Sequence, residues 1–378
     1  MNMDCDVLVI GAGPGGCAVA HTLRRAGWRV ILAERRTYPV DKLCGEFLSP
    51  EGLESLARMG LATPLEGGDF PSIDKVLLSS VAGRCRQERL PAAGLGCSRR
   101  FLDQLLLECG RSIGVEVVEG LRIRTVEGDF ERGFRLQGVG PGGAQQFSAR
   151  LVVGAYGKSG GLKRPSVQDR SRKSKGLMAL KLHLRGGELA GRVELHSFPG
   201  GYAGLCQVEG GRVNLCLLTR VAAFREAGGH PGRFAEKIMR QNPLLGRRLE
   251  ELAPDWEGVL ALGNLEFGRF RLESGGVVRV GDAAVSISPL CGDGMAMALR
   301  AAELLSPTAD EFLAGQCSGT ELVGIYQRCW QKEFRLRLHL GRLLQNVLLR
   351  SGWTRAALAT LDYIPGLGQG LIRWTRGL

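Results

Sequence analysis

A glycine-rich turn near the start of the sequence constrains the fold more than any other feature. The apolar residues 6–10 predict a strand that leads into Gly11-Ala12-Gly13-Pro14-Gly15-Gly16, and a second apolar run, 30–33, ends at Glu34. Gly11 permits a tight turn, Gly13 lets a pyrophosphate approach the backbone, and Gly16 lets the following helix pack closely on the strand. Strand, turn, helix, strand and acid in this order predict a Rossmann-type nucleotide-binding unit.

The acidic residue at the end of the second strand narrows the choice of nucleotide. Glu34 lies 23 residues after Gly11, where its carboxylate can accept hydrogen bonds from an adenosine ribose and would repel a 2′-phosphate. Backbone N–H groups and the helix dipole then hold the phosphates. The motif therefore predicts FAD or NAD, and the binding residues expected beside the turn include Pro14, Gly15 and Arg35.

A second motif near residue 280 decides between these two cofactors. The strand-like run 277–280 ends in Gly281-Asp282, and a glycine-rich stretch, 289–294, leads into a predicted helix from Met295 to Leu305. A carboxylate after a strand can bind the ribityl hydroxyls of a flavin, and the glycine turn can place N–H groups against the isoalloxazine edge. We therefore predict FAD, with further contacts from Gly281, Asp282, Pro289, Gly292, Asp293, Gly294 and Met295.

Length and composition indicate a water-soluble enzyme. The 378 residues are 44% hydrophobic, which is enough for a large core in two lobes. No apolar run reaches the roughly 18 residues that span a bilayer, and nothing before the first strand resembles a signal peptide. The 11 cysteines lack CxxC or zinc-type spacing, so we expect free thiols, no metal site and a cytoplasmic location.

The chain carries a net charge of +12, which bears on the kind of partner it could bind. It is compatible with an anionic membrane surface, an acidic substrate or an acidic carrier protein as a partner, and equally with an arginine-rich proteome and no charged partner. The basic residues are spread out and form no helix dense enough to follow a DNA backbone, so we expect no nucleic acid partner.

Three segments together resemble the flavoprotein monooxygenase superfamily of the para-hydroxybenzoate hydroxylase type. They are the glycine turn with Glu34, the Ser98-Arg99 pair before a predicted helix at 102–107, and Gly281-Asp282 through Gly294. The resemblance spans almost the whole chain. It implies that Arg99 contacts FAD and that Asp282 holds the ribityl or pyrophosphate portion of the cofactor.

The segment 42–50, Lys-Leu-Cys-Gly-Glu-Phe-Leu-Ser-Pro, resembles the geranylgeranyl reductase branch of this superfamily. It also resembles bacterial oxidoreductases that are encoded beside type III polyketide synthases. The resemblance implies that Cys44 contacts the isoalloxazine or the substrate and that Gly45 allows a close backbone approach. Glu46 is a candidate proton donor. The alternatives are a buried apolar thiol for Cys44 and a helix cap or salt bridge for Glu46.

Two departures from the superfamily pattern bear on the reaction. Many hydroxylases carry Asp-Gly in the middle motif, whereas this chain has Tyr156-Gly157. The missing aspartate puts direct reduction by NADPH in doubt and favours a separate flavin reductase, or reduction by the substrate, although NADH or NADPH stays a candidate reductant. The five tryptophans are isolated, so the Trp-x-Trp-x-Ile-Pro segment of flavin-dependent halogenases is absent.

The predicted architecture is α/β, with a Rossmann-type FAD-binding domain, an inserted antiparallel β-sheet substrate domain and C-terminal helices. We assign 1–75, 98–172 and 263–320 to the discontinuous FAD-binding domain. We assign 76–97 and 173–262 to the substrate domain, and 321–378 to the helical region. These basic and apolar helices are expected either to pack on the nucleotide domain or to face a membrane.

Substrate-side residues are predicted on the inserted sheet. The segment 198–205 is interpreted as a turn that presents Phe198 and Tyr202 to the flavin, with a packed hairpin as the alternative. Lys181 and His183 share one face of a strand. They can bind or deprotonate a phenol if that face lines the pocket, but the favoured orientation is toward solvent. His183 is the candidate general base.

The favoured function is a flavin monooxygenase that acts on a hydrophobic aromatic, polyketide or lipid-type substrate, carried in the membrane or by a carrier protein. The main alternative is a reductase or dehydrogenase of carbon–carbon double bonds, in which Cys44 or Glu46 lies near the hydride transfer. Minor alternatives are a halogenase and a flavin-binding protein that carries a lipid without chemistry.

Overall fold

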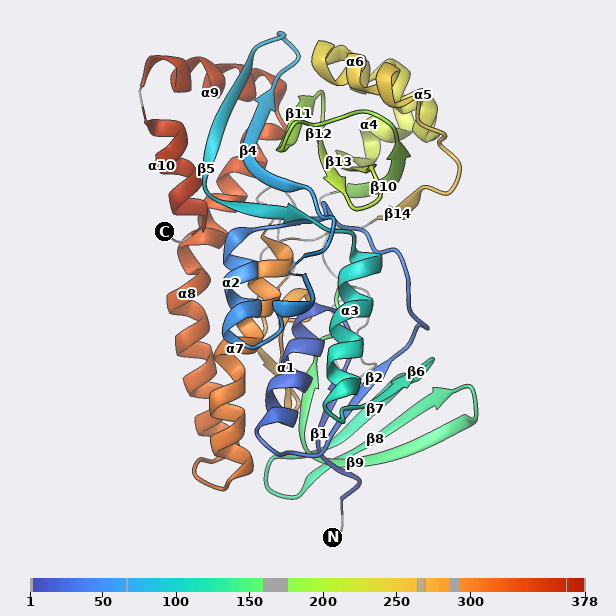
Figure 1. The fold of residues 1–378 in the computed structure, drawn as a ribbon, viewed down its shortest axis with the longest axis vertical. Coiled ribbons are helices and arrows are strands. Elements are labelled where there is room, and N and C mark those ends of the chain that lie inside the picture. The colour runs from blue at the N-terminus through green and yellow to red at the C-terminus, as the bar shows by residue number, and fades with distance from the viewer. Residues whose placement is uncertain are drawn as a thin grey trace.

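Two β-sheets, one mostly parallel and one mostly antiparallel, form the framework of the molecule (Figure 1). The computed structural model describes residues 3–376 except 66, 159–175, 264, 266, 268–269, 286–292 and 365. The predicted fold class is confirmed, because a Rossmann-like sheet, a second β-sheet and C-terminal helices are all present.

The mostly parallel sheet carries the glycine turn at the end of a central strand. Its strand order is β15-β16-β9-β1-β2-β6, and β1 pairs in parallel with β2 and with β9. Strand β1 is almost wholly buried, as expected for a strand with covered faces on both sides. A hairpin of β7 and β8 is attached to β9. The strands are β1 (Cys5–Ile10), β2 (Val30–Glu34), β6 (Glu116–Glu119), β7 (Arg122–Asp129), β8 (Gly133–Gly140), β9 (Gly143–Gly154), β15 (Glu273–Ser274) and β16 (Val277–Arg279).

Helix α1 follows the glycine turn and packs against α3 and α7. Pro14 stands in its first turn, where the missing N–H costs nothing, and Arg24 and Arg25 stand in its last turn, where they complement the helix dipole. The helices of this domain are α1 (Pro14–Arg25), α2 (Pro50–Arg58), α3 (Arg99–Ser112) and α7 (Gly294–Leu313), with the 3-10 turns η1 (Thr63–Leu65) and η3 (Gly281–Ala283).

The second sheet has the order β14-β10-β13-β12-β11-β4-β5-β3. Its neighbours are antiparallel except for β11 and β4, which are parallel. Helices α4 to α6 lie over it at one end of the molecule (Figure 1). The elements are β3 (Phe47–Leu48), β4 (Ser72–Ser79), β5 (Cys85–Gly96), β10 (Leu177–Arg185), β11 (Arg192–Phe198), β12 (Gly201–Val208), β13 (Arg212–Arg220), β14 (Leu260–Leu262), α4 (Val221–Glu226), α5 (Pro231–Lys237), η2 (Met239–Gln241) and α6 (Pro243–Leu252).

Two sequence predictions about this sheet differ from the structure. The segment 198–205 is not a turn, since β12 begins at Gly201 and pairs with both β11 and β13. Only Pro199 and Gly200 connect the strands, and Gly200 takes the positive φ of 79° that the tight connection needs. Residues 47–48 were assigned to the FAD-binding domain, but as strand β3 they pair with β5 of the second sheet. The loop 43–47 therefore lies between the two sheets.

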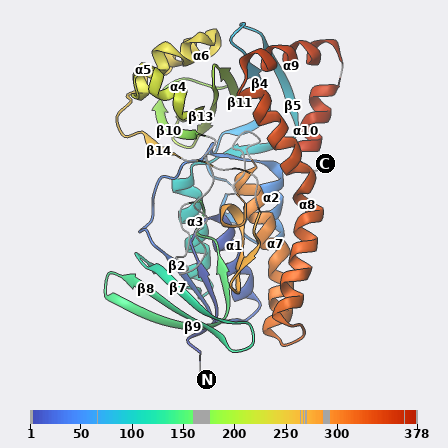
Figure 2. The same cartoon turned by 180° about the vertical axis from the view of Figure 1, so that it is seen from behind.

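The C-terminal helices connect both lobes along one side of the molecule (Figure 2). They are α8 (Gly319–Leu348), α9 (Ser351–Tyr363) and α10 (Leu367–Arg376). Ser318 and Glu321 form a capping box at the start of α8, which packs on α7 and buries Tyr326, Trp330 and Phe334. Helix α9 contacts β11 and α10 contacts β5, so the end of the chain lies against the second sheet.

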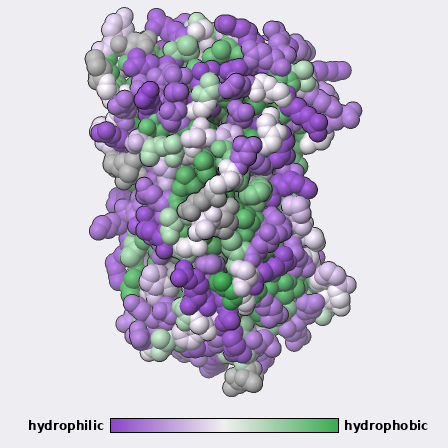
Figure 3. Space-filling model, viewed as in Figure 1, coloured by the Kyte–Doolittle hydropathy of each residue, from purple (hydrophilic) through white to green (hydrophobic). Residues whose placement is uncertain are grey.

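The distribution of hydrophilic residues on the surface and the length of the helices can be compared with the expectations from composition. Hydrophilic side chains cover most of the face seen in Figure 3, and apolar side chains gather near its centre. Among the described residues, none of the helices has the length and apolar character needed to cross a bilayer. The ten cysteines in the described ranges are all free thiols.

Candidate active site

The glycine turn has a backbone that only glycine can adopt. Gly11 has a φ of +105°, and a Cβ on it would lie 2.5 Å from the carbonyl oxygen of Ala155. A Cβ on Gly16 would lie 1.9 Å from the carbonyl oxygen of Gly11. Gly13 caps α1 without any side chain on the helix N–H groups. The turn therefore leaves backbone donors available for a pyrophosphate at the positive end of a helix.

Glu34 lies at the edge of a cavity of about 340 Å³, here called the nucleotide cavity. Its carboxylate is nearly buried and accepts hydrogen bonds from the backbone N–H groups of Ala12, at 2.9 Å, and Arg36, at 3.0 Å. Arg35 and Tyr156 line the same cavity. The acid is thus fixed beside the glycine turn, where an adenosine ribose would lie.

A smaller cavity of about 130 Å³, here called the flavin cavity, continues from the nucleotide cavity. Both are lined by Gly13, Arg99 and Asp282, so an elongated dinucleotide can extend through them. The flavin cavity brings together most of the residues predicted from the sequence: Pro14, Gly15, Gly16, Cys44, Gly45, Glu46, Gly281, Gly294 and Met295. Asp293 is the N-cap of α7, whereas Pro289 and Gly292 lie outside the described residues.

Arg99 is held at this cavity by a buried ionic network. Its guanidinium donates two hydrogen bonds of 2.7 Å to the carboxylate of Asp103, which also forms an ion pair of 2.8 Å with Lys42. Burial alone would raise the pKa of Asp103, but the charges of Arg99 and Lys42 outweigh it and hold that pKa below its usual range. The network fixes Arg99 beside Gly13, whose Cβ would lie 3.5 Å from the guanidinium.

Glu46 connects the loop 43–47 to both lobes. Its side chain is fully buried, and its backbone has a left-handed φ of 58°. The carboxylate accepts hydrogen bonds from the backbone N–H of Arg99 at 2.8 Å, from Lys181 and from the His183 ring. Burial alone would raise the pKa of Glu46, but the bond from His183 and the charge of Lys181 lower it. Glu46 therefore stays ionised and anchors the loop.

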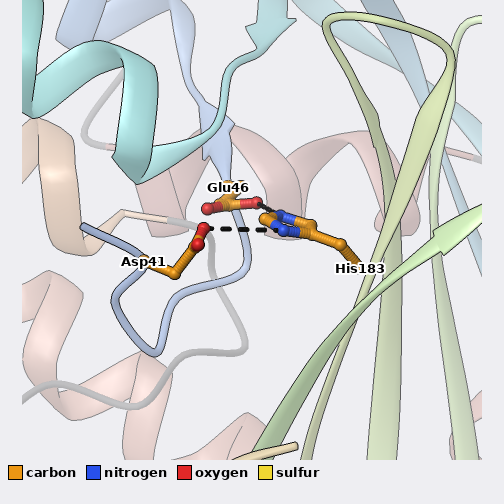
Figure 4. Close-up of side chains that lie close together, drawn as sticks. All are labelled: Asp41, Glu46 and His183. Carbon is orange, nitrogen blue, oxygen red and sulfur yellow. Dashed lines mark hydrogen bonds and ion pairs between the residues drawn. The ribbon is translucent and has the colours of Figure 1, made fainter. Parts of the chain in front are cut away.

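Lys181 and His183 do not face solvent, in contrast to the favoured prediction. The ammonium of Lys181 is buried against Glu46 and also donates to the carbonyl of Lys42 at 2.9 Å. The His183 ring lies between Glu46 and Asp41, with its Nδ1 3.6 Å from the Asp41 carboxylate (Figure 4). An unpaired buried carboxylate would be costly, so Glu46 draws the Lys181 ammonium and the His183 ring inward as hydrogen-bond partners. Neither side chain lines one of the three cavities described here.

Asp41, Glu46 and His183 offer three ligand atoms within 4.8 Å of one another (Figure 4). Such a set can bind a divalent cation in other proteins. Here the ammonium of Lys181 already occupies one oxygen of Glu46, and His183 bonds the other. The positive charge that a metal ion would supply is thus provided by the chain itself.

Cys44 is the predicted catalytic thiol, and the structure places it in the wall of the flavin cavity. It is half-buried, its sulfur accepts a weak hydrogen bond from the backbone N–H of Glu46 at 3.5 Å, and its carbonyl accepts one from Asn214 at 3.0 Å. Within the described ranges, no acceptor for the Cys44 S–H is found. The thiol proton is therefore available to a molecule in the cavity.

A third and larger cavity, of about 380 Å³, has an apolar wall and is here called the apolar cavity. It lies between the second sheet and the helices α8 to α10, and it meets the flavin cavity at Gly45 and Phe47. Its volume is within the roughly 300–1,000 Å³ of typical ligand pockets. Its wall includes Leu78, Leu195, Leu218, Leu344, Val347, Leu348, Ala357, Leu361, Leu367, Leu371 and Ile372.

The two predicted substrate aromatics point to opposite sides of the second sheet. Tyr202 lines the apolar cavity. Phe198 instead packs edge-on against Phe234 of α5, with ring centres 5.6 Å apart, in the core under helices α4 to α6. Because β11 ends at Phe198 and β12 begins at Gly201, the two residues belong to different strands and need not share a face.

Several residues of the site were not predicted from the sequence. Lys42 and Asp103 complete the Arg99 network, and Asn214 holds the carbonyl of Cys44. The spacing of Arg99 and Asp103, four residues apart at the start of a helix, is a signal that could have found this pair. The remaining contacts join residues far apart in the sequence, and no local pattern marks them.

The sequence matches a known family over most of its length. Residues 4–327 match the family described as "FAD binding domain". The chain belongs to this family. It is 26% identical over 349 residues to digeranylgeranylglycerophospholipid reductase 2 of Methanopyrus kandleri, which covers 88% of this chain and 83% of that relative.

Solved structures of this fold extend the comparison. P. aeruginosa PqsL in complex with 2-aminobenzoylacetate has a TM-score of 0.76 and 20% identity, covering 94% of this chain and 99% of that one. The flavin-dependent brominase Bmp2 has a TM-score of 0.78 and 17% identity, covering 99% of this chain and 93% of that one. At these identities the likeness concerns the fold.

Membership of the FAD-binding family confirms three predictions. The cofactor is FAD, the chain is an FAD-dependent oxidoreductase, and the resemblance to the para-hydroxybenzoate hydroxylase type is correct. The residues described here fit that cofactor, since the glycine turn leaves space for a pyrophosphate, the Glu34 carboxylate is held beside that turn, and Asp282 lines both the nucleotide cavity and the flavin cavity.

Proposed function

We propose that this FAD-dependent oxidoreductase saturates carbon–carbon double bonds in the long apolar chain of a lipid. The observation that carries the proposal is the apolar cavity of about 380 Å³, which meets the flavin cavity at Gly45 and Phe47. A hydrocarbon chain can enter it and bring a double bond to the flavin. The likeness to a digeranylgeranylglycerophospholipid reductase over most of both chains supports the same substrate class.

Reduced FAD, when bound, supplies a hydride to one carbon of the double bond, and the other carbon takes a proton. The chain contributes that proton from the thiol of Cys44, a residue that lines the flavin cavity. Glu46 is a positioning residue: its carboxylate is occupied by three donors and fixes the loop that carries Cys44. The apolar walls exclude water from the double bond and orient the chain.

We propose that electrons reach the cofactor from a separate flavin reductase and not by direct reaction with NADH or NADPH. Tyr156 stands in place of the aspartate that the resemblance to the hydroxylases implies, and its ring packs on Gly154 beside the nucleotide cavity. Stopped-flow mixing with NADH or NADPH under argon is expected to leave the oxidised flavin spectrum unchanged for minutes. Rapid bleaching by either nucleotide would contradict this proposal.

Monooxygenation of a lipid-tailed aromatic compound is the second candidate. Tyr202, whose ring lines the apolar cavity, favours it because an aromatic substrate can stack there. The placement of His183 weighs against it, since the predicted base lies behind Glu46 and lines neither cavity. For either reaction the substrate is insoluble in water, so we propose that the chain works at the periphery of a membrane.

One experiment separates the two candidates. The holoenzyme is reduced with dithionite under argon and mixed with a geranylgeranyl lipid in detergent micelles, and the flavin spectrum and product mass are followed. Reoxidation of the flavin with a gain of two hydrogen atoms is the expected result. In a parallel reaction with a lipid-tailed phenol, product that forms only in air and gains one oxygen atom, with no anaerobic change in the geranylgeranyl lipid, would support monooxygenation and overturn the reductase.

A further inference from the structure

The helices that wall the apolar cavity also expose large apolar side chains to the outside. Tyr363, Trp353 and Trp374 are 84%, 58% and 55% exposed, and Ile364 follows Tyr363 at the end of α9. These four residues, which lie on α9, directly after it and on α10, are here called the interfacial surface. Elsewhere in the described ranges, Phe101, Val139, Leu260 and Phe270 are exposed on separate segments, and Leu336 and Leu343 are exposed on α8, the helix that precedes α9.

The sequence around the interfacial surface is mainly basic. Residues 335–376 contain seven arginines and a single acidic residue, Asp362. Arg355 on α9 lies two residues after Trp353, Arg373 on α10 directly precedes Trp374, and both arginines are exposed. Tryptophan and tyrosine prefer the headgroup level of a bilayer, and arginines beside them are attracted to anionic lipids. This combination matches an anionic membrane surface better than a neutral one.

The apolar cavity reaches the same two helices from the inside. Ala357, Thr360 and Leu361 on α9 and Leu371 on α10 line it, and Thr360 is exposed to solvent. The cavity therefore has an edge open at α9, on the element that carries Trp353 and Tyr363. The same cavity is lined by Gly45 and Phe47, which also line the flavin cavity.

We propose that the interfacial surface binds the headgroup region of an anionic phospholipid bilayer and that the cavity edge at Thr360 takes the lipid chain from it. This inference rests on the proposed function for the identity of the substrate, but the binding itself does not. The aromatic side chains insert at headgroup depth, and Arg355 and Arg373 contact lipid phosphates.

Vesicle sedimentation with the full-length holoenzyme tests the proposal. Extruded vesicles of phosphatidylglycerol and phosphatidylcholine are compared with vesicles of phosphatidylcholine alone, at low and high salt. The expected result is binding to the anionic vesicles, weakened at high salt. The variants W353S/Y363S/W374S and R355Q/R373Q should each lose affinity by about tenfold or more. The wild type should also show a blue shift of tryptophan emission on binding.

Matched variants elsewhere on the surface serve as controls. R225Q/R247Q removes two exposed arginines on α4 and α6, and V139S removes an exposed apolar residue on β8. Both should bind vesicles like the wild type, with all variants checked for an unchanged melting temperature. Equal affinity for neutral and anionic vesicles, or equal losses in the control and test variants, would overturn the proposal.

Measuring substrate turnover both in detergent micelles and in vesicles distinguishes a failure of the membrane-binding inference from a failure of the proposed function. With substrate in micelles, the surface variants should match the wild type, whereas with substrate in anionic vesicles they should be slower. Vesicle binding by a protein that turns over no double bond would refute the reductase and leave the membrane surface intact. Turnover in micelles without any vesicle binding would refute the membrane surface alone.

Discussion

At the scale of single residues, Glu46 is the group whose loss should disturb the site most. Glu46→Gln keeps the shape but leaves the Lys181 ammonium, 2% exposed, without a counter-charge. Breaking a buried ion pair from one side costs about 3–5 kcal/mol. Urea unfolding of the apoprotein is expected to show a loss of this size. Glu54→Gln, which breaks an exposed pair with Arg58, should change stability by roughly 0.5 kcal/mol or less. Similar losses in both variants would contradict the anchoring role.

His196 should make stability depend on pH. Its ring is fully buried between Ser79 and Glu194, and burial lowers the pKa of His196 below its ordinary value of 6.5, although the bond to Glu194 acts in the opposite direction. As the pH falls below 6.5, His196 takes up a proton in the unfolded chain before it does so in the native state. The contribution of the neutral, buried ring to stability is therefore complete above pH 6.5 and is lost progressively below it.

The slope of stability against pH provides the test for His196. Between about pH 7 and 5, the loss from one such group reaches at most about 1.4 kcal/mol per pH unit. His196→Gln should flatten this part of the curve, whereas His339→Gln, at an exposed position on α8, should leave it as in the wild type. An unchanged slope in the first variant would mean that other groups set the pH dependence.

At the scale of elements, α9 has two neighbouring alanines with different surroundings. Ala357 lines the apolar cavity, whereas Ala356 is exposed. Ala357→Trp should fill part of the cavity and lower kcat/KM for a long-chain substrate in micelles by about tenfold, which is about 1.4 kcal/mol. FAD affinity, measured by flavin fluorescence, should not change. Ala356→Trp should leave both quantities unaltered, and equal losses in the two variants would argue against a substrate chain in this cavity.

The sequence predicts an element correctly where the residues that specify it lie close together along the chain. The glycine turn and Glu34 were found because each needs a particular residue at a fixed spacing along one βαβ unit. The inward orientation of Lys181 was missed, because strand periodicity gives two residues a common face without saying which side is buried. The cavity wall on α9 and α10 was missed for a similar reason. An amphipathic pattern identifies the apolar face of a helix, but it does not show whether that face packs on the protein core, lines a cavity or contacts a membrane.

At the scale of the whole molecule, FAD should link the stability of both lobes. The flavin cavity is lined by Gly13 and Gly16 from the parallel sheet domain and by Phe47, which pairs with the second sheet. Free FAD at about 100 times its dissociation constant should stabilise the native state by about 2.7 kcal/mol. Because one ligand contacts both lobes, we expect the second sheet to gain hydrogen-exchange protection together with the first.

Gly16→Ala tests this linkage, because its Cβ would lie 1.9 Å from the carbonyl oxygen of Gly11. The variant should lose the stabilisation by FAD and the added protection in both lobes. Gly324→Ala in α8, where the nearest atom would be 3.5 Å away, is the matched control and should respond to FAD like the wild type. Protection gained only in the parallel sheet would show that the loop 43–47 does not transmit binding to the second sheet. The cofactor would then stabilise its own domain alone.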